Sequence, residues 1–447
     1  MLAAVAPGAC AGLDVALPGG VPTTAVSAGS PRLGGREVVE LPLARQAPAT
    51  RSAATAPTAL ATISSSAPAT RGVAGVPITQ SQAFDVVPVY WGTDRKIPSG
   101  PMALVRAPAT SSTAGIVTGS IDKAVLPGID RGDRLVVGRS YVTVPHIARD
   151  KGSIQRPWQV GVLNVSFYAQ KEDPRRHFTL GSFEPMDQAT FARLGNEQLA
   201  KAVRNPGQAL VFVHGFNSTF EDALYRTAQL AYDLEFDGVP YLYSWPSRGE
   251  ETGYLYDRDS ADRAQRYFLE FLEMVAKDSK AERIHLVAHS LGNRPLLEAL
   301  RARGNPAQTA RKLRIDQIVL AAPDIDRDVF VEIARAVNGA GRNTTLYAAH
   351  NDRALKLSRT LARGASRAGD VPDGGPVVVA GVETIDITAA GTDALLSLNH
   401  NTYAEGGHVL ADLRALFRDG VHPPDKRFPV YLAQTSPGGT YWRYVRN

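Results

Sequence analysis

One feature constrains the possible folds of this chain more than any other: a short apolar segment that leads directly into a turn of small residues. Arg283–Ala288 reads as a buried strand, and Ser290 follows within the sequence Ala288-His-Ser-Leu-Gly292. A serine with small residues two positions on either side is a one-residue variant of the G-x-S-x-G turn, where a strand bends sharply into a helix and leaves the hydroxyl exposed. Small residues there let neighbouring backbone approach closely. The segment predicts a strand–turn–helix unit with Ser290 at its tip.

Strands and amphipathic helices alternate from Gln208 onwards. The expected strands are 209–213, 239–244, 283–288, 315–321, 344–349 and 382–387. The expected helices are 220–236, 257–275, 291–301, 327–337, one that starts near 354, and 408–417. Strand–helix–strand units of this length form right-handed crossovers between parallel strands. The pattern therefore predicts an α/β fold with a mostly parallel central sheet and helices on both faces, in which ligands bind at the carboxyl ends of the strands.

The chain divides by composition into four parts. Residues 1–81 are rich in Ala, Pro, Ser and Thr and have almost no aromatic residues, which predicts a disordered tail because little apolar surface can be buried. Residues 82–204 predict a β-rich region packed on the catalytic domain, with strands at 84–91, 135–138, 141–144, 160–168 and 177–180. Residues 205–430 form the predicted catalytic domain, and 431–447 a C-terminal tail.

Composition and charge limit the classes of binding partner that the chain is expected to have. Of the 447 residues, 44% are hydrophobic and 21% are charged, which is ordinary for a globular protein. The net charge of +5 comes from interspersed residues of both signs, which favours a mixed solvated surface over nucleic-acid binding. No apolar run is long enough to span a bilayer. We expect a small-molecule partner, no nucleic acid and no transmembrane span; the sequence leaves the oligomeric state open.

The only cysteine, Cys10, excludes an intramolecular disulfide. Residues 1–16 are weakly hydrophobic, but no Lys or Arg precedes Arg32, so the sequence as written has no secretory signal and favours the cytoplasm. If the true start lies upstream, Cys10 becomes a candidate lipid-acceptor cysteine and the cell envelope or periplasm the expected compartment. We favour an Ala-rich tail that holds an incidental cysteine.

Ser290 is the candidate nucleophile, and a helix N-cap is the alternative interpretation of the same residue. The Leu291 N–H lies at the helix start, where it points at a developing oxyanion with the help of the helix dipole. A second donor must come from a loop near the nucleophile. His214-Gly-Phe-Asn217 ends the first strand of the alternating region, and the Phe216 N–H is the candidate donor.

Two aspartates compete for the role of the catalytic acid. Asp324 ends the strand that follows Ser290, and Asp352 ends the strand after that. The usual order of an α/β hydrolase places the acid after the second strand beyond the nucleophile, which favours Asp352. Asp324 is the alternative acid; its other interpretation is a helix cap or a hydrogen-bonding residue within the site.

Two histidines that follow the last strand compete for the role of the base. His400 lies in a loop that can reach over the sheet edge, whereas His408 opens an amphipathic helix. We therefore favour His400, with His408 as the alternative base. His289 neighbours the nucleophile but points the wrong way to deprotonate it, and His350 fits pocket lining or packing.

No metal or nucleotide motif accompanies these residues. The sequence contains no His-Glu-x-x-His, no cysteine pair, no Walker A sequence and no dinucleotide fingerprint. We therefore expect no cofactor and no metal. The aromatic residues around the loop 246–256 fit either a pocket wall or packing on the sheet, and packing is the commoner case; they are Tyr241, Tyr243, Trp245, Tyr254 and Tyr256.

The motifs taken together resemble an uncharacterised bacterial branch of the α/β-hydrolase superfamily, classed as a domain of unknown function. The matching segments are Val89–Arg95, Phe212–Asn217, Ser244–Ser247, Ala288–Asn293, Leu320–Asp326 and Tyr347–Leu355. The resemblance covers about 84–427 and implies the α/β-hydrolase fold and a triad of Ser290, Asp352 and His400. Where the family often has Gly-His-Ser-Tyr, this chain has Asn399-His-Asn-Thr-Tyr403, which keeps a histidine and a nearby tyrosine.

These residues predict a serine hydrolase that cleaves an ester or thioester through an acyl-enzyme. Two alternatives remain open at this point. One is a non-catalytic binding or scaffold protein that keeps the fold. The other is an acyltransferase or peptidase that uses the same triad. The sequence determines neither the acyl group nor the leaving group of the substrate.

Overall fold

The computed structural model describes residues 83–98, 105–106, 121, 123–146, 159–162, 165–169, 172–350, 365–390 and 403–445. The chain separates into two units, Met1–Ala67 and Pro68–Asn447, and every described residue belongs to the second. Within these residues thirteen strands form one sheet, and β4 (Gln159–Val162) and β5 (Val165–Ala169) pair as a separate antiparallel hairpin. The predicted disordered tail 1–81 and the predicted helix start near Ala354 lie outside the described residues.

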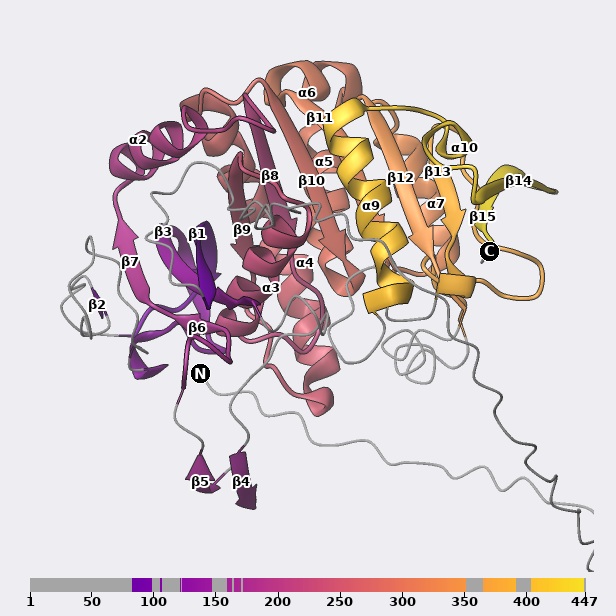
Figure 1. Cartoon of the computed structure of the whole chain (residues 1–447). Helices are drawn as coiled ribbons and strands as arrows, with labels where there is room; N and C mark the ends of the chain where they lie inside the picture. Colours follow the sequence, from indigo (N-terminus) through magenta and orange to yellow (C-terminus); the bar gives the residue numbers. More distant parts are fainter. Residues whose placement is uncertain are drawn as a thin grey trace, which may run out of the picture. The chain divides into compact units, whose positions relative to one another are not determined.

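The centre of the sheet is parallel. Its strands stand in the order β9 (Val239–Ser244), β8 (Gln208–Val213), β10 (Arg283–His289), β11 (Ile315–Ala321), β12 (Asn343–Ala348) and β13 (Glu383–Asp386). Every neighbouring pair in this order is parallel. Because parallel strands share a direction, the loops that follow them meet at one edge of the sheet. The predicted parallel α/β core is confirmed (Figure 1).

The β-rich region extends this same sheet. β1 (Phe84–Arg95) pairs parallel with β9 and antiparallel with β3 (Arg131–Pro145). Beyond β3 the sheet continues with β7 (Ser182–Met186), β2 (Val105–Arg106) and β6 (Thr179–Leu180).

We predicted separate strands at 135–138 and 141–144, but β3 is continuous from Arg131 to Pro145. A Cβ at Gly138 would collide with the Trp91 ring, so this glycine marks close packing instead of a turn. The prediction of one strand over 160–168 also differs from the structure, which has the β4–β5 hairpin there.

The C-terminal segment also joins the sheet. β14 (Tyr431–Ser436) and β15 (Gly439–Tyr444) form an antiparallel hairpin, and β15 pairs parallel with β13. The prediction of a C-terminal tail over 431–447 is therefore wrong for 431–444. The physical reason is that Tyr431 and Tyr444 are buried in the core, which anchors a segment whose other side chains are largely polar.

Helices cover both faces of the sheet, as predicted (Figure 1). One face packs against α3 (Phe220–Asp233) and α9 (Tyr403–Asp419). The other packs against α4 (Tyr254–Asp278), α5 (Asn293–Arg303) and α7 (Arg327–Ala336). Residues of each strand alternate between the two cores, because successive side chains point to opposite faces. The remaining helices are η1 (Lys123–Val125), α2 (Gln188–Leu199), η2 (Glu251–Gly253), η3 (Ser290–Gly292), α6 (Pro306–Leu313), η4 (Thr388–Ala390) and α10 (Pro424–Arg427).

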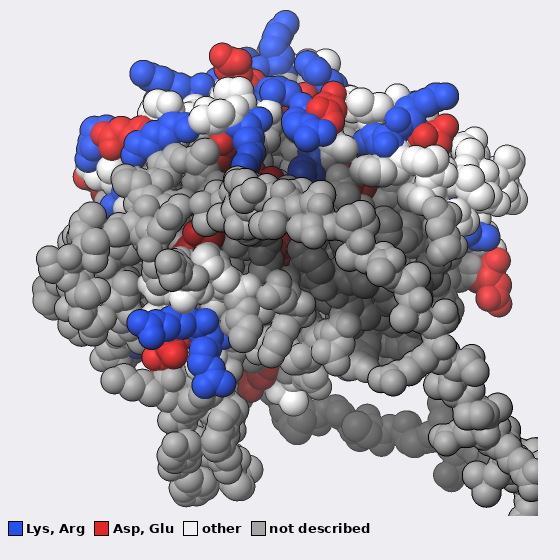
Figure 2. All heavy atoms as spheres, viewed as in Figure 1, with Lys and Arg blue, Asp and Glu red and all other residues white. Residues whose placement is uncertain are grey.

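Charge is distributed unevenly over the described residues on the face shown in Figure 2. Lys and Arg side chains, with acids between them, gather along the edge at the amino ends of the parallel strands (Figure 2). Exposed members of this group are Lys201, Lys280, Arg311 and Lys312. Within the described part of the chain, no helix has both the length and the apolar character needed to cross a membrane.

Candidate active site

Ser290 stands at a strained turn between β10 and the helical segment η3–α5. Its φ of 49° lies in the left-handed region, which a non-glycine residue rarely adopts. The Ser290 carbonyl accepts hydrogen bonds from the Asn293 side-chain amide (2.8 Å) and from the Asp324 N–H (3.2 Å). The Asn293 amide also donates to the Ala321 carbonyl. These contacts hold the turn in a conformation that costs roughly 1–3 kcal/mol in an isolated residue.

The Ser290 hydroxyl has no hydrogen-bond partner among the described residues, although the residue is only 2% exposed. We predicted an exposed hydroxyl; the structure instead encloses it. The loop after β8 packs against it, since a Cβ built on Gly215 would lie 3.0 Å from the Ser290 Cβ. A buried hydroxyl without a partner is uncommon in folded proteins, and a catalytic role is one of the explanations for it.

Gly292 brings the turn against the end of β8. A Cβ at Gly292 would collide with the His214 carbonyl oxygen and lie 2.8 Å from the Val213 carbonyl oxygen. Both obstacles are backbone atoms, which cannot move aside as a flexible side chain can. The glycine therefore sets how closely the serine turn and the His214–Phe216 loop approach each other.

We expect Gly292→Ala to lower the free energy of unfolding by about 1–3 kcal/mol, because the added methyl must push two backbone segments apart. Chemical denaturation followed by circular dichroism measures this loss. Gly374→Ala is the matched control, since a Cβ there meets nothing within 4 Å. Equal stability of the two variants would contradict the close approach at Gly292.

His214 is a buried, neutral ring. It stacks on Trp245 with ring centroids 4.9 Å apart, and the Trp245 indole N–H donates to the His214 carbonyl. Burial, with the Arg95 guanidinium as the second cause, lowers the pKa of His214 to about 3. His289, beside the nucleophile, also stays neutral, because burial and then Arg226 lower its pKa to about 4. Its Nδ1 lies 2.9 Å from the place of a Cβ on Gly215, so the ring packs against that loop.

Leu291 is the chain neighbour of Ser290, and Phe216 follows Gly215, which packs against the serine. Leu291 lies in η3 and its side chain is buried. The Phe216 ring lies edge-on against Tyr254 at 5.4 Å. The aromatic residues before the 246–256 loop pack mainly in the core, since Tyr241, Tyr243 and Trp245 are fully buried.

Asp324, the alternative acid, lies close to the nucleophile, as its N–H bond to Ser290 shows. Its carboxylate is buried and already engaged. Oδ2 accepts from the Tyr254 hydroxyl (3.0 Å), and Oδ1 lies 3.4 Å from Arg367 Nε. A carboxylate held by a hydroxyl and a guanidinium has less capacity to orient an imidazole.

Asp352 and His400 both lie outside the described residues, so their predicted roles stay predictions. Asp352 follows β12 and His400 follows β13, and both strands end at the same edge as β10. His350 is described: its Nδ1 bonds to the Val371 carbonyl at 2.8 Å. The alternative base, His408, is exposed in α9, where its ring lies 5.6 Å from Tyr444.

Sequence reasoning assigned no role to a buried polar cluster beneath these loops. Arg95 contacts the loops after β8 and β9. Asp257 accepts hydrogen bonds from the Ser247 hydroxyl, the Arg248 N–H and the Asn217 N–H. Burial raises the pKa of Asp94 to about 6, against the opposing hydrogen bond of Tyr243 and the charge of Arg263. The available signal was the polar run Thr93–Arg95 at the end of an apolar strand.

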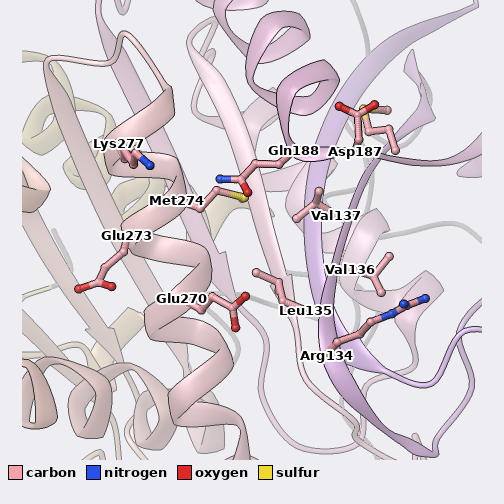
Figure 3. A pocket seen from close by; sticks show the side chains of 11 residues that line it. Arg134, Leu135, Val136, Val137, Asp187, Gln188, Glu270, Glu273, Met274 and Lys277 are labelled. Carbon is pink, nitrogen blue, oxygen red and sulfur yellow. The ribbon is translucent and has the colours of Figure 1, made fainter.

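No group of acids, histidines or cysteines among the described residues is arranged to hold a metal ion. A cavity of about 590 Å³ opens between β3, the start of α2 and α4, and Figure 3 shows its lining. Its lining includes the apolar Leu135 and Met274 and the charged Glu270 and Lys277. None of the predicted site residues lines this cavity.

Comparison with known proteins agrees with the fold described above. The model of the family described as "Alpha/beta hydrolase of unknown function (DUF900)" matches residues 192–417, half of the chain. The chain belongs to this family. Membership shows the α/β-hydrolase fold and supports a hydrolase-type function. The match spans the Ser290 turn and the Phe216 loop, together with Asp352 and His400, but it leaves out β1 and Arg95.

The chain was also compared with solved structures and with curated protein sequences. The chain is similar to the crystal structure of the "putative cell surface hydrolase from Lactobacillus plantarum WCFS1", with 12% sequence identity and a TM-score of 0.31. The similarity covers 51% of this chain and 96% of that one. No curated protein sequence matches the chain.

Proposed function

We propose that this member of the family is a serine hydrolase that cleaves an ester or thioester through an acyl-enzyme. The observation that carries the proposal is Ser290 itself. Its backbone is strained, its buried hydroxyl has no partner among the described residues, and a glycine loop packs against it. Strained residues with unsatisfied polar groups cluster at functional sites.

In the proposed first step, the Ser290 oxygen attacks the acyl carbonyl while His400 takes the hydroxyl proton. Asp352 accepts a hydrogen bond from the imidazole and stabilises its protonated form. The N–H groups of Phe216 and Leu291 donate to the tetrahedral oxyanion, where the loss of one donor typically costs about 3 kcal/mol of barrier.

In the second step, the tetrahedral intermediate collapses and the bond to the leaving group breaks. His400 returns its proton to the leaving alcohol or thiol, and the acyl group stays on Ser290. Water then attacks the acyl-enzyme with His400 again as the base, and the carboxylic acid leaves. His214 takes no part in these proton transfers, because its low pKa makes it a weak proton acceptor and its ring nitrogens bond to Gly215 and Ser244.

Covalent labelling tests this proposal directly. We expect a fluorophosphonate to add one mass increment to the wild-type protein and peptide mapping to place it on Ser290. A panel of p-nitrophenyl esters and matched thioesters of increasing acyl length then identifies the substrate class. A folded wild-type protein that reacts with neither probe nor panel would contradict the proposal and favour a binding or scaffold role. Faster product formation with added alcohol or amine would favour an acyltransferase.

A further inference from the structure

Arg95 is a buried cation placed at the same edge of the sheet as Ser290. β1 pairs parallel with β9, with Thr93 opposite Ser244, so the two strands end together. Arg95 follows at the end of β1 and is 1% exposed. Burial lowers its pKa to about 10, opposed by the nearby carboxylates of Asp94 and Asp257, so the guanidinium remains charged at neutral pH.

The guanidinium joins two loops beside the nucleophile. Its Nη2 donates to the Ser218 carbonyl (2.8 Å), in the loop after β8. Its Nη1 donates to the Ser247 carbonyl (2.9 Å), in the loop after β9. Its Nε donates to the Ser244 hydroxyl oxygen (3.1 Å). Because several N–H groups leave a guanidinium in fixed directions, one side chain sets the positions of both loops.

A directed hydrogen-bond relay leads from Arg95 through Ser244 to His214. His214 Nδ1 lies 2.9 Å from the Gly215 carbonyl oxygen, which can only accept, so Nδ1 must carry the proton. The neutral ring then has its lone pair on Nε2, 3.2 Å from the Ser244 hydroxyl, which must donate. The hydroxyl oxygen in turn accepts from Arg95, which has no acceptor to offer. With the proton on Nδ1, all three contacts of the relay are satisfied together.

The relay ends on the peptide that carries the proposed oxyanion donor. The Gly215 carbonyl and the Phe216 N–H belong to one peptide unit and point in opposite directions, because the trans peptide is planar. The bond from His214 thus holds the Gly215 oxygen toward the imidazole and directs the Phe216 N–H away from it. If this peptide turned over, the bond from His214 would be lost and a carbonyl would replace the N–H.

We propose that Arg95, Ser244 and His214 are positioning residues that set the Phe216 N–H for the oxyanion before substrate binds. This inference rests on the proposed serine-hydrolase function. It also gives the β-rich region a role: Arg95 lies on β1, outside the segment 192–417 that matches the family. β1 would then help to position the active site as well as extend the sheet.

Ser244→Ala tests the relay by removing its middle member. We expect kcat per active site, counted by fluorophosphonate titration, to fall about 10- to 100-fold, because one oxyanion donor is misoriented. KM should stay within about twofold, since the donor acts mainly in the transition state. Ser140→Ala is the matched control: its buried hydroxyl also accepts an N–H, from Trp91, but lies on β3. Because kcat is expressed per titrated site, partial unfolding of the variant lowers the number of active sites but not kcat. A wild-type kcat per site in Ser244→Ala would therefore overturn the relay.

The tautomer of His214 gives a second test, on the wild-type protein, that does not depend on activity. Nitrogen-15 NMR of the wild-type imidazoles at pH 7, with His214→Gln for assignment, should show His214 protonated on Nδ1 alone. A proton on Nε2, or on both nitrogens, would overturn the relay even if Ser244→Ala fails to fold. A wild-type protein that shows the Nδ1 tautomer but no Ser290 adduct would support the hydrogen-bond relay while contradicting the proposed function.

Discussion

Ser290→Ala and Ser290→Gly should both abolish turnover, and the glycine variant should be the more stable of the two. Loss of the nucleophile of a triad typically lowers kcat on the order of 10⁶-fold. Glycine adopts a positive φ without strain, whereas alanine keeps the strain of the 49° turn. We therefore expect Ser290→Gly to be about 1 kcal/mol more stable than Ser290→Ala, measured by chemical denaturation.

The two variants are matched controls for each other. Both remove the hydroxyl, so turnover and the fluorophosphonate adduct should disappear equally. Only the backbone preference differs, so a difference in unfolding free energy reports the strain of the turn. Residual labelling of Ser290→Ala would place the nucleophile elsewhere, and equal stability of the pair would show that the turn relaxes without cost.

The parallel core could be predicted closely because its strands are buried on both faces. The expected strands 239–244 and 315–321 coincide with β9 and β11, whose residues are all buried. A continuous apolar run of this length needs no information from distant residues. By contrast, α6 spans only eight residues and buries only Thr309 and Leu313, so it is shorter than the window over which helical periodicity can be read.

The same distinction applies to the site. The Ser290 turn could be located from residues 288–293 alone, and the sequence indicated it directly. The role of Arg95 is not local: its partners Ser244 and Ser247 lie about 150 residues away in the chain. An arginine is usually found at the surface, and only the pairing of β1 with β9 shows that this one is enclosed.

If Asp352 and not Asp324 is the acid, the isosteric variants Asp352→Asn and Asp324→Asn should differ greatly in kcat. Asp352→Asn should lower kcat about 10⁴-fold, because an amide favours the wrong imidazole tautomer and cannot stabilise the imidazolium. Asp324→Asn should lower it less than about tenfold. Its carboxylate already accepts from Tyr254 and faces Arg367, and the N–H that holds Ser290 belongs to the backbone, which the substitution keeps.

Steady-state kinetics on one ester, with circular dichroism to verify folding, separates the two carboxylates. His400→Ala and His408→Ala extend the test to the base. We expect His400→Ala to lose activity to the level of Ser290→Ala, and His408→Ala to keep it, since His408 is exposed beside Tyr444. If Asp324→Asn lost more activity than Asp352→Asn, the acid would be Asp324. If His408→Ala lost more than His400→Ala, the base would be His408. If Asp324 were the acid, its bond to Tyr254 would have to open for the carboxylate to reach an imidazole, and Tyr254→Phe would then raise kcat instead of leaving it unchanged.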